Sequence, residues 1–547
     1  MTREQHFPPL SIRGQKQAET GKKFEQFEKS ALNAYHRDNP QGTVNLGIAD
    51  NTLLYRELVD YFKRNFHLTC SDLTYCASHR GDPRLCHALA DFINTYFNPC
   101  KPVNSSHIVV GAGLVAILSQ LVGALTNPGD GVLVASPYYY GYDTELMAQQ
   151  GVAPVGVAIP KSDMFTPAEL DYFERALVQS NKKGTRIKAV ILCNPHNPLG
   201  LPYPEDAIIE YGKFCEKHNL QLICDEVYAL SVFSSRDVPV PEPFISALSL
   251  DLESHGINPC RVHVLYGMSK DFSCSGFRLG ALITSPSNKS LIHSMIISAF
   301  FSCPSSPAMN LWATLLSDKP FLSHFLKTNR LKLQEAYDYM SSWLRFHKIP
   351  YMPSSAGHFI LVDMRPVLSD MQRYGSLLSL GAEEHAEDDM AERETALLEF
   401  FSKHGVWLTP GSACHMEHGW FRVTFSLRRD FIDVALARME DALGWERWPG
   451  LLGAGPPLEQ LLPEPQPHWQ QHEQQQQEKE QPQPQPRTEL VPATYGVIWN
   501  WPLFLLSTAR YVTAKVRASL FFFLLRSRRS RVERTLSPVY QRHTGAI

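Results

Sequence analysis

YGMSKDFSCSGFRLG, residues 266–280, is the stretch from which the fold and the chemistry can be worked out. It follows the β-rich run RVHVL (261–265) and brings Ser269, Lys270 and Arg278 into one short loop. Lys270 can form an imine with an aldehyde, while Arg278 presents a planar fork of donors to a phosphate, with the Ser269 hydroxyl as a second donor. The grouping suits a cofactor that carries both an aldehyde and a phosphate. An ordinary surface loop explains this segment equally well, because short lysine and glycine patterns recur by chance.

Two apolar runs upstream end in polar residues that suit the same cofactor. LQLIC (220–224) is typical of a buried strand and is followed by Asp225. A buried aspartate is costly unless a cation pairs with it, and a protonated pyridine nitrogen is such a cation. IKAVIL (187–192) is the continuous apolar run of a sheet covered on both faces. The NPHNPLG segment that follows predicts a rigid turn that projects Asn197 over the sheet edge.

Two predicted strands earlier in the chain also lead into segments that could contact such a cofactor. The strand predicted over 132–135 leads into SPYYYGYD, where Tyr139 can stack on a flat ring. Core packing is the usual role of a lone tyrosine, but a cluster of tyrosines on a loop indicates a flat ligand or an interface. The strand predicted over 107–110 leads into a GAG turn and a helix, whose first backbone amides can bind a phosphate. These amides belong to Gly113, Leu114 and Val115.

The alternation of strands and helices predicts an α/β domain with a mainly parallel sheet. The residues above then lie at the carboxyl ends of its strands, where open α/β sheets bind ligands. From about residue 320 the pattern changes to a helix (321–347), a strand (354–364) and a last helix (431–443), which predict a smaller α+β domain. The WFRV run places Arg422 on a strand of that domain, where a solvated edge position is its alternative role.

The SK-x5-G-x-R-x-G pattern of residues 269–280 resembles the pyridoxal-phosphate (PLP) lysine motif of the fold-type-I, aspartate aminotransferase-like PLP-dependent transferases. Its form is most similar to the 1-aminocyclopropane-1-carboxylate (ACC) synthase-like branch, and the similarity runs from about Gly42 to about Glu446. The resemblance implies PLP as the cofactor. The residues that it implies for cofactor binding are Lys270, Ser269, Arg278, Asn197, Asp225, Tyr228, Tyr139, Gly113, Leu114 and Val115.

The resemblance also implies individual roles. Lys270 binds the cofactor and moves the Cα proton, and Asp225 keeps the ring nitrogen protonated so that the ring is an electron sink. Asn197 and Tyr228 hydrogen-bond to the phenolate oxygen of the cofactor. Arg422 clamps the α-carboxylate of the substrate in a bidentate pair. The predicted catalytic residues are thus Lys270, Asp225 and Tyr228, and no metal ion is expected.

Three positions depart from the family pattern. Asp50, in NLGIADN, stands where ACC synthases carry a substrate-pocket glutamate, and its alternative role is a helix N-cap. His79 stands where the loop that enters the neighbouring subunit's site carries a tyrosine, so its role implies a homodimer. Gly267 replaces a phosphate-binding serine. Asp50 and His79 join Arg422 as predicted substrate-binding residues, and their identities disfavour the cyclopropane-forming reaction.

The predicted function is that of a PLP-dependent enzyme that deprotonates the Cα of an L-α-amino acid, for transamination or for a deaminating elimination. The first alternative is an ACC synthase that converts S-adenosylmethionine to ACC. The second alternative is a catalytically weak PLP-fold protein that acts through interactions. The intact Lys270, Asp225 and Arg422 argue against the second alternative, whereas Gly267 and the hydroxyl-free helix start argue for it.

Composition sets the wider limits. The 547 residues are 44% hydrophobic and 20% charged with a net charge of −3, which is typical of a globular protein and provides no field that attracts nucleic acid. The 11 cysteines include no CxxC pair, and residues 1–16 have no apolar core of the kind that a secretory signal needs. We therefore expect free thiols and a cytoplasmic location.

The predicted domains are an amino-terminal arm with part of the small domain (1–60), a large PLP-binding domain (61–319) and a small domain (320–447). Residues 1–40 predict an arm or a surface helix, and the acidic residues 377–393 a surface insertion. A disordered linker rich in Pro and Gln follows (448–490). The hydrophobic and basic tail (491–547) predicts either a segment in a membrane interface or a tail without a fixed partner.

Overall fold

The computed structural model of the chain describes residues 10–22, 32–36, 38–75, 78–378 and 389–451. Its strands are β1 (Val44–Asn45), β2 (Ile108–Gly111), β3 (Gly131–Ser136), β4 (Ala153–Ala158), β5 (Ile187–Cys193), β6 (Gln221–Asp225), β7 (Val262–Gly267), β8 (Gly280–Thr284), β9 (Tyr351–Met352), β10 (Phe359–Asp363), β11 (Val406–Trp407), β12 (Thr409–Pro410) and β13 (Trp420–Thr424). Its α-helices are α1 (Ile12–Lys22), α3 (Tyr55–Asn65), α4 (Pro83–Tyr96), α5 (Leu114–Leu125), α6 (Gly141–Gln150), α7 (Glu169–Lys182), α8 (Glu205–Lys217), α9 (Lys289–Phe301), α10 (Ser306–Ser317), α11 (Lys319–Phe346), α12 (Arg365–Ser369), α13 (Met371–Tyr374), α14 (Asp389–Lys403) and α15 (Arg429–Leu443).

The larger sheet has seven strands in the order β2-β8-β7-β6-β5-β3-β4. β8 is antiparallel to both of its neighbours, and the other adjacent pairs are parallel. In β5, Val190 and Leu192 belong to one hydrophobic cluster, whereas Ala189 and Ile191 belong to another. Because side chains alternate across a strand, the sheet is covered on both faces. The predicted α/β fold with a mainly parallel sheet is thereby confirmed.

The parallel strands end at one edge of this sheet, and that edge gathers the predicted site residues. Gly113 follows β2, Tyr139 follows β3 and Asn197 follows β5. Asp225 is the last residue of β6, and Lys270 follows β7. The topology thus brings together five segments that are far apart in the sequence, as expected for a ligand site of an open α/β sheet.

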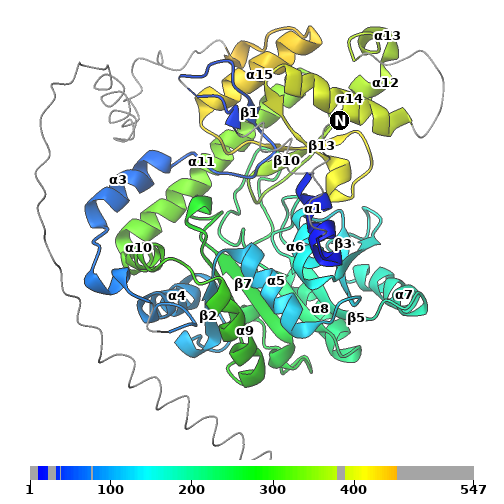
Figure 1. Cartoon of the computed structure of the whole chain (residues 1–547). Helices are drawn as coiled ribbons and strands as arrows, with labels where there is room; N and C mark the ends of the chain where they lie inside the picture. Colours follow the sequence, from blue (N-terminus) through cyan, green and yellow to red (C-terminus); the bar gives the residue numbers. More distant parts are fainter. Residues whose placement is uncertain (1–9, 23–31, 37, 76–77, 379–388, 452–547) are drawn as a thin grey trace, which may run out of the picture. The chain divides into compact units, whose positions relative to one another are not determined.

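A second, smaller sheet has the order β12-β13-β10-β9, with antiparallel neighbours, and carries Arg422 on β13. Helices α11, α14 and α15 contribute Leu344, Leu397 and Leu436 to a separate hydrophobic cluster around it. β1, from the amino-terminal part of the chain, pairs with β11 of this region. Figure 1 shows the long helix α11 extending from α10, beside the larger sheet, to this second group of strands. The boundaries between the domains stay predictions.

Two predictions about β10 and α3 are wrong in detail. The strand predicted over 354–364 begins only at Phe359, because Gly357 has a φ of +77° and interrupts the extended backbone. Helix α3 begins at Tyr55 with Leu54 as its N-cap. Asp50 is therefore not the N-cap of this helix, and that alternative role is excluded.

The structure describes only parts of the two chain ends and of the acidic segment 377–393. Helix α1 has no buried residue, so the surface helix predicted within residues 1–40 is confirmed. Of the acidic segment, the part from Asp389 onward begins α14, and residues 379–388 lie outside the described residues. The tail 491–547 and the linker from residue 452 onward also lie outside them. Within the described residues, no helix is both long and apolar enough to span a membrane.

Candidate active site

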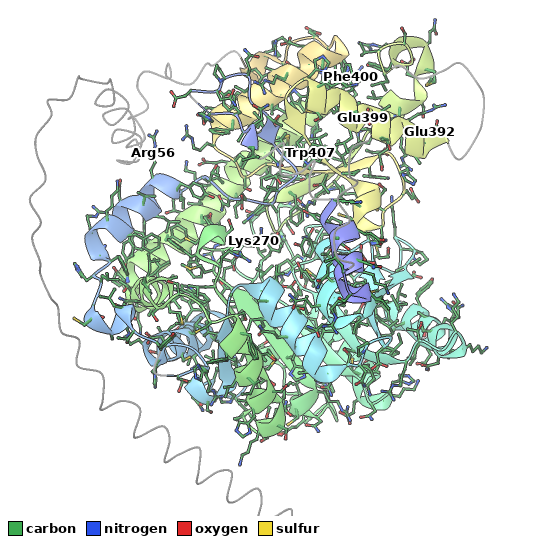
Figure 2. All side chains as sticks on the ribbon, viewed as in Figure 1. Arg56, Lys270, Glu392, Glu399, Phe400 and Trp407 are labelled. Carbon is green, nitrogen blue, oxygen red and sulfur yellow. The ribbon has the colours of Figure 1, made fainter. Side chains whose placement is uncertain are left out.

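Lys270 lies between the larger sheet and the region that contains β10 and β13 (Figure 2). Its Nζ donates a hydrogen bond to the carbonyl of Ala49 at 2.7 Å. Desolvation lowers the pKa of Lys270 to about 8, and the nearby charge of Asp50 acts in the opposite direction. A substantial fraction of this amine is therefore neutral near pH 8, which a nucleophile and a proton acceptor both require.

Asp225 is buried at the end of β6. Its Oδ2 accepts a hydrogen bond from the Tyr142 hydroxyl at 2.7 Å, and its Oδ1 lies 3.4 Å from the backbone nitrogen of Val227. Burial raises the pKa of Asp225, and the charge of Lys270 partly offsets this. A buried carboxylate is stabilised by a neighbouring cation, and a protonated ring nitrogen would supply one here.

Arg278 stands over the amino terminus of α5. A Cβ placed on Gly113, which has a φ of +85°, would lie 2.6 Å from Nη2 of Arg278, so glycine leaves the room that the guanidinium occupies. Nη1 of Arg278 donates a hydrogen bond to the carbonyl of Ser275 at 2.8 Å. A helix amino terminus carries a partial positive charge and disfavours a nearby cation. An anion that accepts from both the helix amides and Arg278 would relieve this repulsion.

The other side of this anion site is apolar. A Cβ on Gly267 would lie 2.5 Å from Cδ1 of Leu114, so Leu114 occupies the space into which a larger residue at 267 would project. Leu114 and Val115 carry no hydroxyl, so they can donate hydrogen bonds only through their backbone amides. In the first turn of a helix these amides have no intrahelical partners. Ser269 is half-buried in the turn after β7.

Arg422 approaches the site from β13, and its side chain is only 1% exposed. Nη1 donates to Oδ1 of Asn197 at 3.0 Å and Nη2 donates to the carbonyl of Gly47 at 2.6 Å. Nε is buried and has no hydrogen-bond partner among the described residues. Because its observed partners are neutral oxygens, the buried guanidinium is charged but unpaired, which a carboxylate ligand would correct.

Tyr228 and Tyr139 line the same space. Tyr228 is buried, and its ring lies edge-on to Phe359 with the ring centroids 5.5 Å apart. Burial raises the pKa of Tyr228, and the positive charge of Arg422 offsets part of this increase. Tyr139 packs edge-on against Tyr142 with ring centroids 5.3 Å apart. Both tyrosines therefore lie where the sequence predicts them, and their roles stay predictions.

Asp50 and His79 lie in different surroundings. Asp50 accepts a hydrogen bond from the Ser275 hydroxyl at 3.1 Å and is close enough to Lys270 to raise its pKa. His79 is exposed, and its ring contacts Phe300 of α9 edge-on at 5.1 Å. Within one chain, the structure thus brings Asp50 to the lysine and places His79 on the surface.

Three groups of this site were not predicted from the sequence. Tyr142 contacts Asp225, and Glu145 of α6 has a pKa raised to about 7 by burial and then by the charge of Asp225. His358, just before β10, is fully buried close to Lys270. The tyrosine-rich run 138–142 is the sequence feature that could have indicated Tyr142. Nothing in the sequence distinguishes Glu145 or His358 from ordinary polar residues.

The described residues fit PLP. Lys270 would be the amine for its aldehyde, Asp225 the partner for its ring nitrogen, and Arg278 with the α5 amides the site for its phosphate. The close approach of Arg278 to Gly113 and the unpartnered Nε of Arg422 are the observations that call for a phosphate and a carboxylate. The apolar surroundings of Gly267 remove one phosphate donor from this site without closing it.

Comparisons with known proteins identify what this chain is similar to. Residues 41–439 match the family model "Aminotransferase class I and II". A probable aminotransferase of Aspergillus fumigatus is 33% identical over 416 residues, which cover 74% of this chain and 90% of the relative. 1-Aminocyclopropane-1-carboxylate synthase 3 of Solanum lycopersicum is 28% identical over 76% of this chain and 86% of the relative. A probable inactive 1-aminocyclopropane-1-carboxylate synthase-like protein 2 of Mus musculus is 30% identical over 76% of this chain and 68% of the relative.

Among solved structures, the aspartate aminotransferase of Thermus thermophilus with maleate matches with a TM-score of 0.58 at 19% identity. The match covers 80% of this chain and all of that one. At this identity the likeness establishes the fold alone, and it confirms the predicted aspartate aminotransferase-like fold.

Proposed function

Because this chain belongs to the class I and II aminotransferases, we propose that it is a PLP-dependent enzyme that transaminates an L-α-amino acid. One observation carries the proposal. Nζ of Lys270 contacts the carbonyl of Ala49, next to Asp50, and the charges of Asp50, Arg422, Arg278 and Asp225 all affect its pKa, so these four charged side chains lie within electrostatic range of one amine. Such a convergence of charged groups of both signs on one buried amine is more typical of an active site than of a structural ion-pair network.

Each residue has a task that follows from its position. When bound, PLP supplies an aldehyde and a ring that withdraws electrons from Cα. Arg422 would hold the α-carboxylate of the substrate and thereby orient the Cα–H bond toward Lys270. Lys270 would accept the Cα proton on Nζ, which its lowered pKa allows near neutral pH. Asp225 would hold the proton of the ring nitrogen, and Tyr142 would fix the orientation of that carboxylate.

Transamination is favoured over ring closure by the residues at two positions. Asp50 reaches one methylene less far than the glutamate of the synthase pattern, and it already accepts a hydrogen bond from Ser275. His79 cannot offer the phenol that the synthase pattern has at its position. The relatives support the same choice, because the fungal probable aminotransferases are 32–33% identical, whereas the plant ACC synthases are 28–29% identical.

A panel of L-amino acids, read by the visible spectrum of the PLP-loaded full chain, tests the proposal. A transamination substrate shifts the spectrum and yields a 2-oxo acid, and a second 2-oxo acid restores the original spectrum. Release of ammonia with an oxo acid indicates a deaminating elimination instead. ACC from S-adenosylmethionine identifies the synthase activity. A chain that acquires no visible absorption with PLP contradicts the proposal and favours the interaction-protein hypothesis.

The ACC synthase alternative has its own test. The double variant His79→Tyr with Asp50→Glu restores the residues of the synthase pattern at both positions. We expect no ACC from the unmodified chain and a measurable amount from the double variant. Efficient ACC formation by the unmodified chain shows that the two departures do not control the reaction and that ring closure is the function.

We also propose that the chain is a homodimer. Ile297, Phe300 and Phe301 expose 65%, 57% and 83% of their surface on α9, beside the loop that carries His79. Contiguous exposed apolar residues are typical of an interaction surface. Sedimentation of the full chain and of Phe300→Ser/Phe301→Ser measures this, and we expect the variant to be monomeric and inactive. The cytoplasmic location stays a prediction.

A further inference from the structure

Arg422 contacts two aromatic rings in addition to its hydrogen-bond partners. Its Cζ lies over the ring of Tyr140, 5.4 Å from the ring centroid, and over the ring of Phe359 at 5.1 Å. A guanidinium within about 6 Å of a ring centroid is attracted by the electrons of the ring face. This attraction uses none of the N–H donors of Arg422. It therefore holds the side chain while Nε, which has no hydrogen-bond partner among the described residues, stays available to a carboxylate.

The two rings reach Arg422 from different parts of the fold. Phe359 is the first residue of β10, which pairs with β13, and its side chain is fully buried. It therefore belongs to the same small sheet as Arg422. Tyr140 lies between β3 of the larger sheet and α6, and it is only half-buried. The contact of Tyr140 with the guanidinium thus depends on how its segment is held against the smaller sheet.

Several contacts fix the segment that carries Tyr140. The backbone nitrogen of Tyr138 donates a hydrogen bond to the carbonyl of Cys414 at 2.9 Å. The ring of Tyr138 stacks on that of His415 with centroids 4.1 Å apart. Nε2 of His415 in turn lies 2.7 Å from Oδ2 of Asp143, one turn into α6. The chain on both sides of Tyr140 is therefore attached to the segment that leads into β13.

The hydroxyl of Tyr140 does not account for its position. The hydroxyls of Tyr138 and Tyr142 each donate a hydrogen bond to an aspartate, at 2.9 and 2.7 Å. Within the described part of the chain, the hydroxyl of Tyr140 makes no hydrogen bond. The contacts of its side chain are those of the ring, with Arg422 and with Tyr139, whose ring centroid is 5.1 Å away. The ring face is therefore the part of Tyr140 that bears on the site.

We propose that Tyr140 is a positioning residue for Arg422, and that its ring holds the guanidinium in the orientation that binds a carboxylate. The proposal rests on the proposed function, in which Arg422 binds the α-carboxylate of the substrate. A side chain that is already held in place loses less freedom when its ligand binds, so affinity increases. Because every α-amino acid presents the same carboxylate, Tyr140 acts on the affinity for all of them and not on the choice among them.

The first test measures how well the guanidinium is covered, in the full chain freed of cofactor. Modification of Arg422 by phenylglyoxal is followed by mass spectrometry and normalised to the exposed Arg56. Phenylglyoxal attacks a neutral guanidine, whereas the ring covers this group and favours its charged form. In Tyr140→Leu we expect modification to be about three- to tenfold faster, which lies within the range of a cation–π contact. In Tyr140→Phe, which keeps the ring, the rate should stay near that of the unmodified chain.

The second test measures carboxylate affinity with propionate, which has no amino group and needs no PLP. Its binding should protect Arg422 from phenylglyoxal. We expect the concentration that gives half-protection to rise by about three- to tenfold in Tyr140→Leu and to change little in Tyr140→Phe. In the PLP-loaded chain, Tyr140→Leu should raise KM for every amino acid substrate by a similar factor and affect kcat far less. This pattern is typical of a lost interaction that the ground state and the transition state share.

Two further variants complete the design. Tyr172→Leu is the matched control, because it removes another tyrosine whose ring lies under an arginine, Arg175, at 4.3 Å. It should leave the modification of Arg422 unchanged. His415→Ala loosens the segment that carries Tyr140 but keeps the ring, so we expect a smaller rise in the rate.

The proposal can fail while the proposed function stands. An unchanged rate of Arg422 modification in Tyr140→Leu overturns it, as does an equal rise in Tyr140→Phe. If Tyr140→Leu does not fold, Tyr140→Met, which also lacks a ring, is judged by the same criteria. Protection by propionate that is equal in the unmodified chain and in Tyr140→Leu refutes only the inference about Tyr140. Absence of protection in the unmodified chain instead contradicts the carboxylate site on which both proposals depend.

Discussion

The two ends of the candidate site differ in what the chain supplies to a cofactor. At the ring end, Asp225 has a hydrogen-bonded orienting partner in Tyr142, and Lys270 lies close to it. At the phosphate end, Gly267 lies against the apolar side chain of Leu114, and Arg278 stands over the amino terminus of α5. In the proposed function the chemistry takes place at the ring end, and the phosphate end serves to anchor the cofactor. Lys270 and Asp225 follow the family pattern at the ring end, whereas Gly267 departs from it at the phosphate end.

Lys270→Ala should have the largest effect. The variant loses the amine that binds the aldehyde and moves the Cα proton, so we expect no turnover and no visible absorption characteristic of PLP bound to the protein. Spectra and activity with the best amino acid of the panel measure this. Circular dichroism should be unchanged, because the side chain makes one hydrogen bond, to Ala49, whose carbonyl can accept from other donors. Cofactor that stays covalently attached after borohydride reduction and denaturation shows that another lysine does this work.

Asp225→Ala should reduce kcat by about 10²–10³-fold, the scale for removing one preorganised electrostatic group. Without the carboxylate the ring nitrogen loses its proton and the ring withdraws electrons poorly. Glu145→Gln is the control, because it neutralises the neighbouring half-buried carboxyl group and should change kcat far less. Steady-state kinetics at saturating PLP measure both. Equal losses in the two variants show that the site needs negative charge in general and not a partner for the ring nitrogen.

Arg422→Lys should raise KM for every amino acid of the panel by a similar factor. Lysine is a point donor and cannot form the two parallel hydrogen bonds of a guanidinium. We expect a loss of about 2–3 kcal/mol, the scale for a charged hydrogen bond, or roughly 30–150-fold in kcat/KM. Arg278→Lys is the control at the other end of the site, and it should weaken PLP binding while leaving KM for the amino acid nearly unchanged. A KM that is the same in Arg422→Lys and the unmodified chain excludes the carboxylate clamp.

The sequence predicted the sheet and the residues at its edge because both follow from short-range patterns. The IKAVIL run and the strand-terminal position of Asp225 are local features, and the structure contains both as expected. The contacts of His358, Glu145 and Leu114 could not be predicted in this way. Each depends on the side-chain geometry of segments 80 or more residues apart, such as Leu114 against Gly267. The N-cap alternative for Asp50 failed for a related reason, since a tertiary contact with Ser275 holds that carboxylate.

The smallest expected effect tests the phosphate end directly. Gly267→Ser alone should weaken PLP binding, because the new Cβ would lie 2.5 Å from Cδ1 of Leu114 and 2.9 Å from the carbonyl of Leu279. Leu114→Ala alone removes an apolar contact and should change PLP affinity little. In the double variant the contact with Leu114 is removed, whereas the 2.9 Å contact with the backbone carbonyl of Leu279 remains. We therefore expect the double variant to recover most of the PLP affinity that Gly267→Ser loses, and to differ from the unmodified chain by less than about 1 kcal/mol, the net value of a typical hydrogen bond.

Equilibrium dialysis of PLP against the unmodified chain, the two single variants and the double variant measures the coupling between positions 114 and 267. Residues in contact are expected to couple, whereas independent residues add. Kcat of the double variant should match that of the unmodified chain at saturating PLP, since Asp225 and Lys270 are unaltered. Strict additivity of the two changes in affinity shows that Leu114 does not fill the place of the missing hydroxyl. A lower kcat shows instead that the phosphate end also positions the ring, and that anchoring and chemistry are not separate in this site.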